Sequence, residues 1–100
     1  MKKTQIIKVP KWKVKVKESN GEYSYIYTRK IRGESIFIFI GGSWTGDDRI
    51  SVEVRGMSTF GLEGGYFKTI AQANAYTKKA MLHINSGVEK FSGRHTSYGF

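Results

Sequence analysis

Apolar and basic side chains alternate along residues 9–17, strictly so from Pro10 onward. Such alternation with a period of two is typical of a β-strand that has one buried face and one solvated face. Trp12, Val14 and Val16 fall on one side of the expected strand. The lysine row on its other side consists of Lys11, Lys13, Lys15 and Lys17.

Two tight turns extend this strand into an antiparallel meander. Asn20-Gly21 is a strong hairpin signal, because both residues tolerate a positive φ, and it predicts a second strand over residues 23–32. Gly33-Glu34 predicts a second turn, of type II′, with Gly at the first central position. Further strands are expected over residues 35–40 and 49–55, with residues 57–62 as a candidate fifth strand.

The turns fix the register of the strands, and the register decides which side chains share a face. The first turn places Val16 opposite Tyr25 and Val14 opposite Tyr27, and the second places Tyr27 opposite Ile40. One sheet face then gathers the residues expected in the core. They are Trp12, Val14, Val16, Tyr25, Tyr27, Ile31, Ile36, Ile38 and Ile40.

A helix near the C-terminus is expected to cover this core face. Thr69 and Gln72 fit a capping box, and Gly87 predicts the end of the helix near Ser86. The predicted fold is therefore α+β, with a meander of four or five strands, one C-terminal helix packed on one face, and the other face largely exposed. Residues 1–88 are expected to form the single domain and residues 89–100 a loosely attached tail. The apolar stripe of the helix consists of Ile70, Ala73, Thr77, Ala80, Met81 and Ile84.

The composition argues against enzymatic chemistry. The chain has no Cys, and its two histidines, His83 and His95, have no partners at the spacing of a metal site or a catalytic triad. Asp47 and Asp48 are consecutive acids in a loop, where solvating a turn or balancing Arg49 is the commoner role. We therefore expect no enzyme, no cofactor and no metal. An intracellular, cytoplasmic location is expected, because there is no secretory signal and no apolar run of membrane-spanning length.

The net charge of +9 is concentrated at the start of the chain. Residues 1–32 carry ten bases and two acids, a net charge of +8. Positive charge of this density attracts polyanions. The predicted register places most of these bases beside two phenylalanines, which suggests a nucleic-acid-binding face. The alternative is a solvated face whose lysines only discourage aggregation at a sheet edge. The expected binding residues are Lys11, Lys13, Lys15, Lys17, Lys30, Arg32, Phe37 and Phe39.

Other residues favour a protein partner instead. Small basic domains without Cys are also typical of phage proteins that bind and inhibit or adapt a host protein or nucleoprotein complex. Trp44 in a glycine-rich loop can anchor an interface, or it can fold back on the core. The basic and aromatic tail can order on a partner, or it can be a frayed end. The candidate partner-binding residues are Trp44, Lys78, Lys79, Leu82 and Arg94.

In outline, a meander followed by a helix is similar to the three-stranded AP2 and integrase arm-binding domains, which insert a sheet face into the DNA major groove. The passage of residues 65–69 into Ala73 and Tyr76 resembles the strand-to-helix passage of AP2 domains over about a dozen residues. Phe37 and Phe39 resemble the aromatic pair of RNA-recognition motifs, but the βαββαβ order of that family is absent. Neither resemblance assigns a family or transfers a contact residue to this chain.

Overall fold

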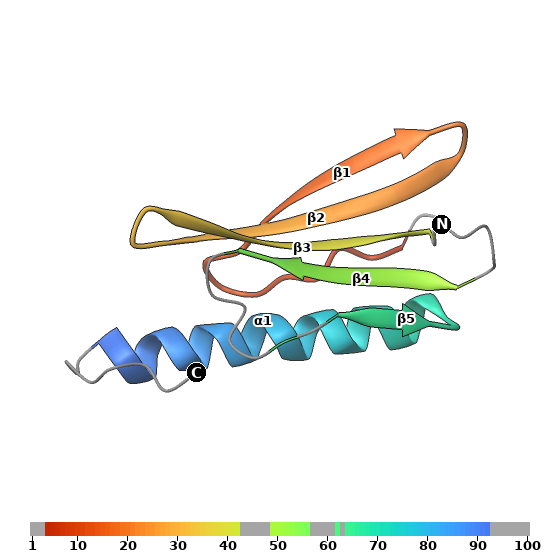
Figure 1. Ribbon diagram of the computed structural model, residues 1–100. Coiled ribbons are helices and arrows are strands. Elements are labelled where there is room, and N and C mark those ends of the chain that lie inside the picture. Colours follow the sequence, from red (N-terminus) through yellow and green to blue (C-terminus); the bar gives the residue numbers. More distant parts are fainter. Residues whose placement is uncertain (1–3, 43–48, 57–61, 63, 93–100) are drawn as a thin grey trace.

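The computed structural model describes residues 4–42, 49–56, 62 and 64–92, the last five of them by their backbone alone. The expected α+β fold is confirmed: one antiparallel sheet in the order β1-β2-β3-β4-β5 packs against one helix (Figure 1). The fifth strand of the structure lies at Gly65–Phe67, later in the chain than the candidate strand over residues 57–62. Residues 57–61 lie outside the described residues, and Leu62 is in no strand. The elements are β1 (Lys13–Ser19), β2 (Glu22–Ile31), β3 (Glu34–Gly42), β4 (Ile50–Arg55), β5 (Gly65–Phe67) and α1 (Ile70–Ser92).

The first hairpin has the expected turn and register. Asn20 and Gly21 have φ values of 52° and 81°, as a type I′ turn requires, and the Glu18 carboxylate accepts a hydrogen bond of 2.8 Å from the Gly21 N–H. Val16 pairs with Tyr25, and every pair from Lys13 to Glu18 is the predicted one. The lysines at positions 13, 15 and 17 therefore lie on one face.

The second turn lies one residue earlier than expected. Arg32 and Gly33, with φ values of 51° and 83°, occupy its central positions, so it is of type I′ rather than type II′. Type I′ fits the right-handed twist of the flanking strands and leaves the glycine at the second central position. Tyr27 consequently pairs with Ile38 instead of Ile40. This shift of two residues keeps every side chain of β3 on its predicted face, because side chains alternate with a period of two.

The expected strand over residues 9–17 begins only at Lys13. Pro10 and Lys11 instead form a turn that is closed by a 3.2 Å hydrogen bond from the Trp12 N–H to the Val9 carbonyl. Lys11 has a φ of 76°, the value of the third residue of a type II turn, and proline is common just before that position. Lys11 is therefore not part of the lysine row and does not pair with Lys30.

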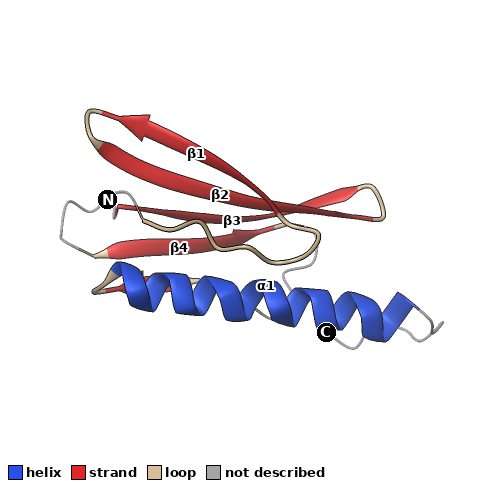
Figure 2. Ribbon diagram, turned by 180° about the vertical axis from the view of Figure 1, so that it is seen from behind, coloured by secondary structure: helices blue, strands red, loops and turns tan. Residues whose placement is uncertain are grey.

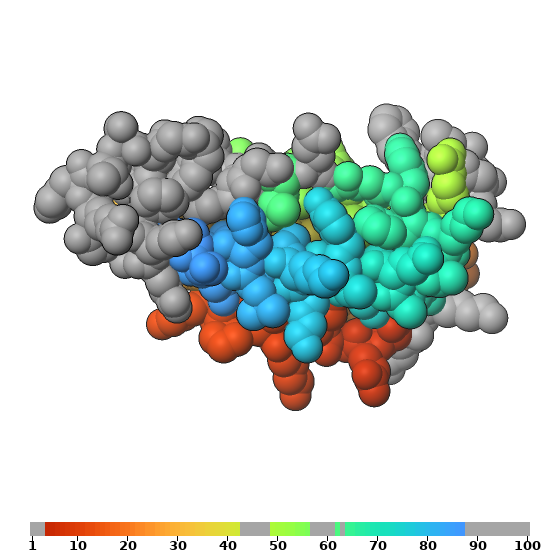
Figure 3. Space-filling view, turned by 90° about the horizontal axis from the view of Figure 1, so that it is seen from below, coloured from red at the N-terminus to blue at the C-terminus, as the bar shows by residue number. Residues whose placement is uncertain are grey.

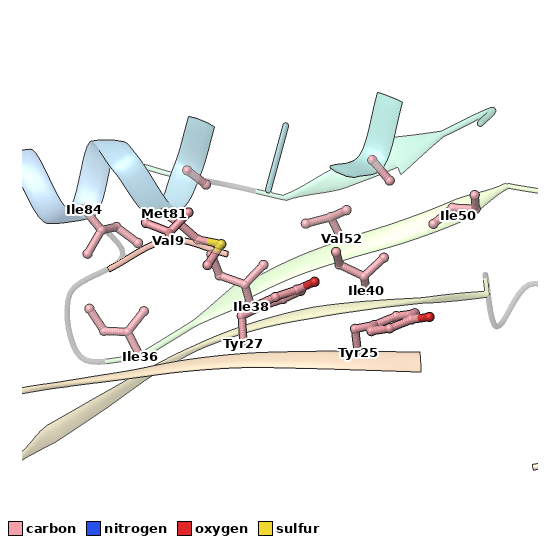
Figure 4. Close-up of a cluster of buried hydrophobic side chains, with 12 residues drawn as sticks. Val9, Tyr25, Tyr27, Ile36, Ile38, Ile40, Ile50, Val52, Met81 and Ile84 are labelled. Carbon is pink, nitrogen blue, oxygen red and sulfur yellow. The ribbon is translucent and has the colours of Figure 1, made fainter. Parts of the chain in front are cut away.

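The core lies between the sheet and α1 (Figure 4). The apolar stripe of the helix is confirmed, with Ile70 half-buried and the rest buried, and the Thr77 hydroxyl donates a 2.8 Å hydrogen bond to the Ala73 carbonyl. Val16 was expected in the core but is 41% exposed, because the end of the β1–β2 hairpin diverges from the helix (Figure 1). The buried apolar side chains are Val9, Tyr25, Tyr27, Ile36, Ile38, Ile40, Ile50, Val52, Ala73, Ala80, Met81 and Ile84.

The helix begins as expected and ends later. The Thr69 hydroxyl accepts a 3.1 Å hydrogen bond from the Gln72 N–H, and the Gln72 side chain accepts one of 3.2 Å from the Lys68 N–H. The expected end at Gly87 is wrong, because the helix continues through Ser92. A glycine ends a helix by adopting a left-handed backbone, whereas Gly87 keeps the helical conformation. In the described part of the chain, no helix combines the length and the apolar character that crossing a membrane requires.

The segment before β1 runs alongside α1, on the side away from β5 (Figure 3). The Tyr25 hydroxyl accepts a 2.9 Å hydrogen bond from the Thr4 N–H and donates one of 3.2 Å to the Thr4 carbonyl. The Tyr27 hydroxyl accepts a 3.0 Å hydrogen bond from the Ile7 N–H, and Val9 is 6% exposed. This N-terminal segment, residues 4–12, therefore completes the core layer on the helix side of the sheet (Figure 2).

Asn85 on α1 connects three parts of the chain. Its side-chain oxygen accepts hydrogen bonds from the Trp12 indole, at 2.8 Å, and from the Arg29 guanidinium. Its side-chain nitrogen donates a 3.0 Å hydrogen bond to the Pro10 carbonyl. One amide thus joins the N-terminal segment, β2 and the helix.

We predict that Asn85→Ala lowers the free energy of unfolding by about 2 kcal/mol, because it leaves two donors and a carbonyl without their partner. Urea denaturation measures this change. Ser86→Ala is the matched control, because Ser86 is exposed on the same helical turn and should change stability by less than about 0.5 kcal/mol. Equal effects of the two substitutions would contradict the role assigned to Asn85.

The buried Tyr27 hydroxyl makes stability depend on pH in the alkaline range. Burial raises its pKa above the ordinary value of 10.0, although the hydrogen bond from Ile7 opposes the shift. The folded protein therefore keeps this proton to a higher pH than the unfolded chain does. The contribution of Tyr27 to the free energy of unfolding is therefore largest below pH 10, and it declines as the pH rises past 10.

We predict that Tyr27→Phe costs about 1 kcal/mol at pH 7, because the Ile7 N–H loses its acceptor. The stability difference between the two proteins should narrow between pH 9 and pH 11, since only the wild type has this hydroxyl to ionise. Urea denaturation of both proteins across this range is the measurement, and the titration of the lysines cancels in the comparison. If the stability difference between the two proteins stays constant over this range, the ionisation of Tyr27 does not affect stability and the prediction is wrong.

Candidate nucleic-acid interface

The sheet face that points away from α1 carries the candidate site, and we call it the open face. Its side chains come from alternate positions of the strands, and the register aligns them in rows that cross the sheet. No described element packs against this face (Figure 1). The rows are Lys13–Thr28–Phe37–Arg55, Lys15–Ile26–Phe39–Glu53 and Lys17–Ser24–Gly41–Ser51–Tyr66.

An aromatic pair occupies the centre of the open face. Phe37 and Phe39 both project from β3, the middle strand, and their ring centroids lie 6.0 Å apart with a tilt of 33°. Both side chains are half-buried. Arg55 lies beside them, with its guanidinium 5.8 Å from the Phe39 centroid and 2.6 Å from the Glu53 carboxylate. The centre of the face thus offers two phenyl rings flanked by one ion pair.

A basic edge lies across β2 from this aromatic pair. Lys13, Lys15 and Lys17 project from β1, which is an edge strand, and Lys30 projects from β2 on the same face. All four side chains are exposed, and within the described residues no carboxylate forms an ion pair with them. Alternate residues of a strand stand about 6.8 Å apart, so the three lysines of β1 form a regular row of cations.

Two of the expected binding residues lie outside the strands that form the open face. Lys11 is in the turn that precedes β1, and Arg32 is in the turn between β2 and β3. Both have a positive φ, a backbone that takes a residue out of the strand alternation. The other six expected residues, at positions 13, 15, 17, 30, 37 and 39, share the open face as predicted.

Three of the five expected partner-binding residues lie close together on one helix in the described structure. Lys78, Lys79 and Leu82 lie on α1 and are exposed, with Leu82 47% exposed, and the helix packs on the sheet face opposite the open face. Trp44 and Arg94 lie outside the described residues.

The sequence did not predict the residues that β4 and β5 contribute to the open face. The Arg49 guanidinium lies 4.8 Å from the centroid of the Tyr66 ring, which is 47% exposed, and Arg55 lies beside the phenylalanines. The alternation over residues 49–55 already placed Arg55 on one side of a strand, but it did not show which sheet face that side belongs to. No sequence signal predicted β5, which has only three residues.

The charge of the open face is strongly positive. Six bases and two acids lie on it, so its formal net charge is +4. Across the described residues, no three side chains of His, Asp or Glu gather where they could hold a metal ion. The charged residues counted are Lys13, Lys15, Lys17, Lys30, Arg49, Arg55, Glu22 and Glu53.

The chain was compared with protein-family models, curated proteins and solved structures, and none of them matches it. A function therefore has to be inferred from the chemistry of the open face.

Proposed function

We propose that this protein is a non-enzymatic nucleic-acid-binding module whose contact surface is the open face. The observation that carries this proposal is the aromatic pair of Phe37 and Phe39 beside a row of exposed lysines. Lysines on an edge strand alone would be explained by protection against aggregation. A solvated face, however, has no need of two phenyl rings at its centre, whereas rings next to cations suit a ligand that carries both phosphates and bases.

The lysines of the open face attract the phosphates of the nucleic acid. An exposed ammonium group has three donors and no acceptor, so it can bind the oxygens of a phosphate without giving up an existing ion pair. Each phosphate that is neutralised releases condensed counterions, which makes the affinity depend on salt. With Lys11 in a turn, four lysines of the open face remain for phosphates: Lys13, Lys15, Lys17 and Lys30.

The second candidate function is the binding of a host protein by a small protein of phage type. It is favoured by Leu82, which is 47% exposed on α1 near Lys78 and Lys79, on the side opposite the open face. An exposed leucine flanked by cations suits an acidic partner. A pull-down from lysate treated with nuclease separates the candidates, because a protein partner stays bound while bridging nucleic acid is lost.

We predict that the logarithm of the association constant for nucleic acid falls with the logarithm of salt concentration. Four phosphate contacts give a slope of about −2.8 for a single strand and about −3.6 for a duplex. The double charge reversal Lys13→Glu/Lys15→Glu should weaken binding about 100-fold near 0.1 M salt, because it removes two contacts and adds repulsion. Fluorescence anisotropy of a labelled oligonucleotide over a salt series measures both effects.

Lys78→Glu/Lys79→Glu is the matched control, since it makes the same change of charge on exposed side chains of α1 instead of β1. Both double variants alter exposed side chains, so each should unfold within about 0.5 kcal/mol of the wild type. If only the helix variant lost binding, the binding site would lie on α1 and not on the open face. An affinity indifferent to salt and to the β1 variant would refute the proposal.

A further inference from the structure

We infer that the ligand of the open face is single-stranded nucleic acid, with its backbone along β1 and two successive bases stacked on Phe37 and Phe39. The inference rests on the proposed function and adds the class of ligand and its orientation. It comes from two rows of the sheet, each of which places a lysine and a phenyl ring in line.

The register gives each ring its own lysine. Lys13, Thr28 and Phe37 share one row, and the next row contains Lys15 and Phe39. The lysines are about 6.8 Å apart along β1, and the ring centroids are 6.0 Å apart. The face thus repeats one unit twice at nearly constant spacing: a cation for a phosphate and a π-face for the base of the same nucleotide.

This spacing requires an unstacked strand. Successive bases in a duplex are separated by about 3.4 Å, much less than the 6.0 Å between the rings. One base on each ring is therefore possible only where the backbone is extended and the bases are separated. A single strand can adopt this arrangement, and aromatic side chains commonly hold unstacked bases in this way.

The space between the lysines and the rings also suits a nucleotide. β1 and β3 are separated by two strand spacings, about 9.6 Å in total. Between them, Ile26 and Thr28 are half-buried, and neither carries a charge that would compete for the phosphate. The sugar and the inner part of the base can lie over these two side chains. Beyond the rings, Arg55 and Glu53 offer donors and acceptors to the outer edges of the bases.

A duplex fits the centre of this face poorly. Base pairs in a groove are recognised mainly through hydrogen bonds to their edges, from Arg, Lys, Asn or Gln. The two strands at the centre instead present Ile26, Thr28, Phe37 and Phe39 to the ligand. A phenyl ring can contact a thymine methyl group in the groove, but the faces of the paired bases are covered by their neighbours.

The test compares three labelled ligands of 12 nucleotides by fluorescence anisotropy near 0.1 M salt: a mixed-sequence single strand, a duplex of the same length, and an abasic strand with the same phosphates. We expect the single strand, as DNA or as RNA, to bind at least about 10-fold more tightly than the other two. Equal or tighter binding of the duplex would overturn the inference, and so would equal binding of the abasic strand. In both cases the proposed function survives, whereas binding to none of the ligands would refute that function itself.

A pair of double variants tests the rings. Phe37→Leu/Phe39→Leu keeps apolar side chains of similar size but removes the π-faces, so it should weaken single-strand binding about 10- to 100-fold while leaving the salt slope unchanged. Phe37→Tyr/Phe39→Tyr keeps the rings and should bind within about threefold of the wild type. Wild-type affinity in the leucine variant, with an unchanged urea midpoint, would refute stacking. The abasic strand tests the same point without any variant.

Discussion

Two tight turns with a positive φ decide which side chains of β1, β2 and β3 lie on the open face. The Asn20-Gly21 and Arg32-Gly33 turns each hold two residues in a left-handed backbone, and this geometry fixes the register of β1, β2 and β3. A register shifted by one residue would send the lysines of β1 toward the helix and its valines into solvent. The separation of an apolar face from a basic face therefore depends on two short stretches of backbone.

Packing on the opposite face of the sheet holds the strands of the open face in place. Tyr25 and Tyr27 are buried on that side, and their hydroxyls hold the N-terminal segment in place through Thr4 and Ile7. Asn85 joins the same segment to α1 and β2. A surface that stacks bases has to keep its rings at a fixed distance. A β3 strand packed on its other side through Ile36, Ile38 and Ile40 can do this.

Most of the candidate site could be predicted from the sequence, because successive side chains of a strand alternate between the two faces of the sheet. The alternation of β1 and the phenylalanines of β3 gave the correct face even though the second turn was misplaced, since an error of two residues preserves the faces. Lys11 was assigned wrongly because the Pro10 turn interrupts the alternation without changing its appearance in the sequence. Arg55 was missed because its face depends on the pairing of β4 with β3, which follows a long connection rather than a tight turn.

The sequence by itself determined the strands of the meander, the two faces of β1 to β3 and the buried stripe of the helix. Each of these follows from local backbone preferences and from periodicity along one stretch of chain. Only the tertiary structure decided where the N-terminal segment lies, that β5 joins the sheet, and that Arg49 and Tyr66 meet at its edge. These features depend on contacts between residues far apart in the chain, and no local pattern records which distant partner completes the burial or the hydrogen bond.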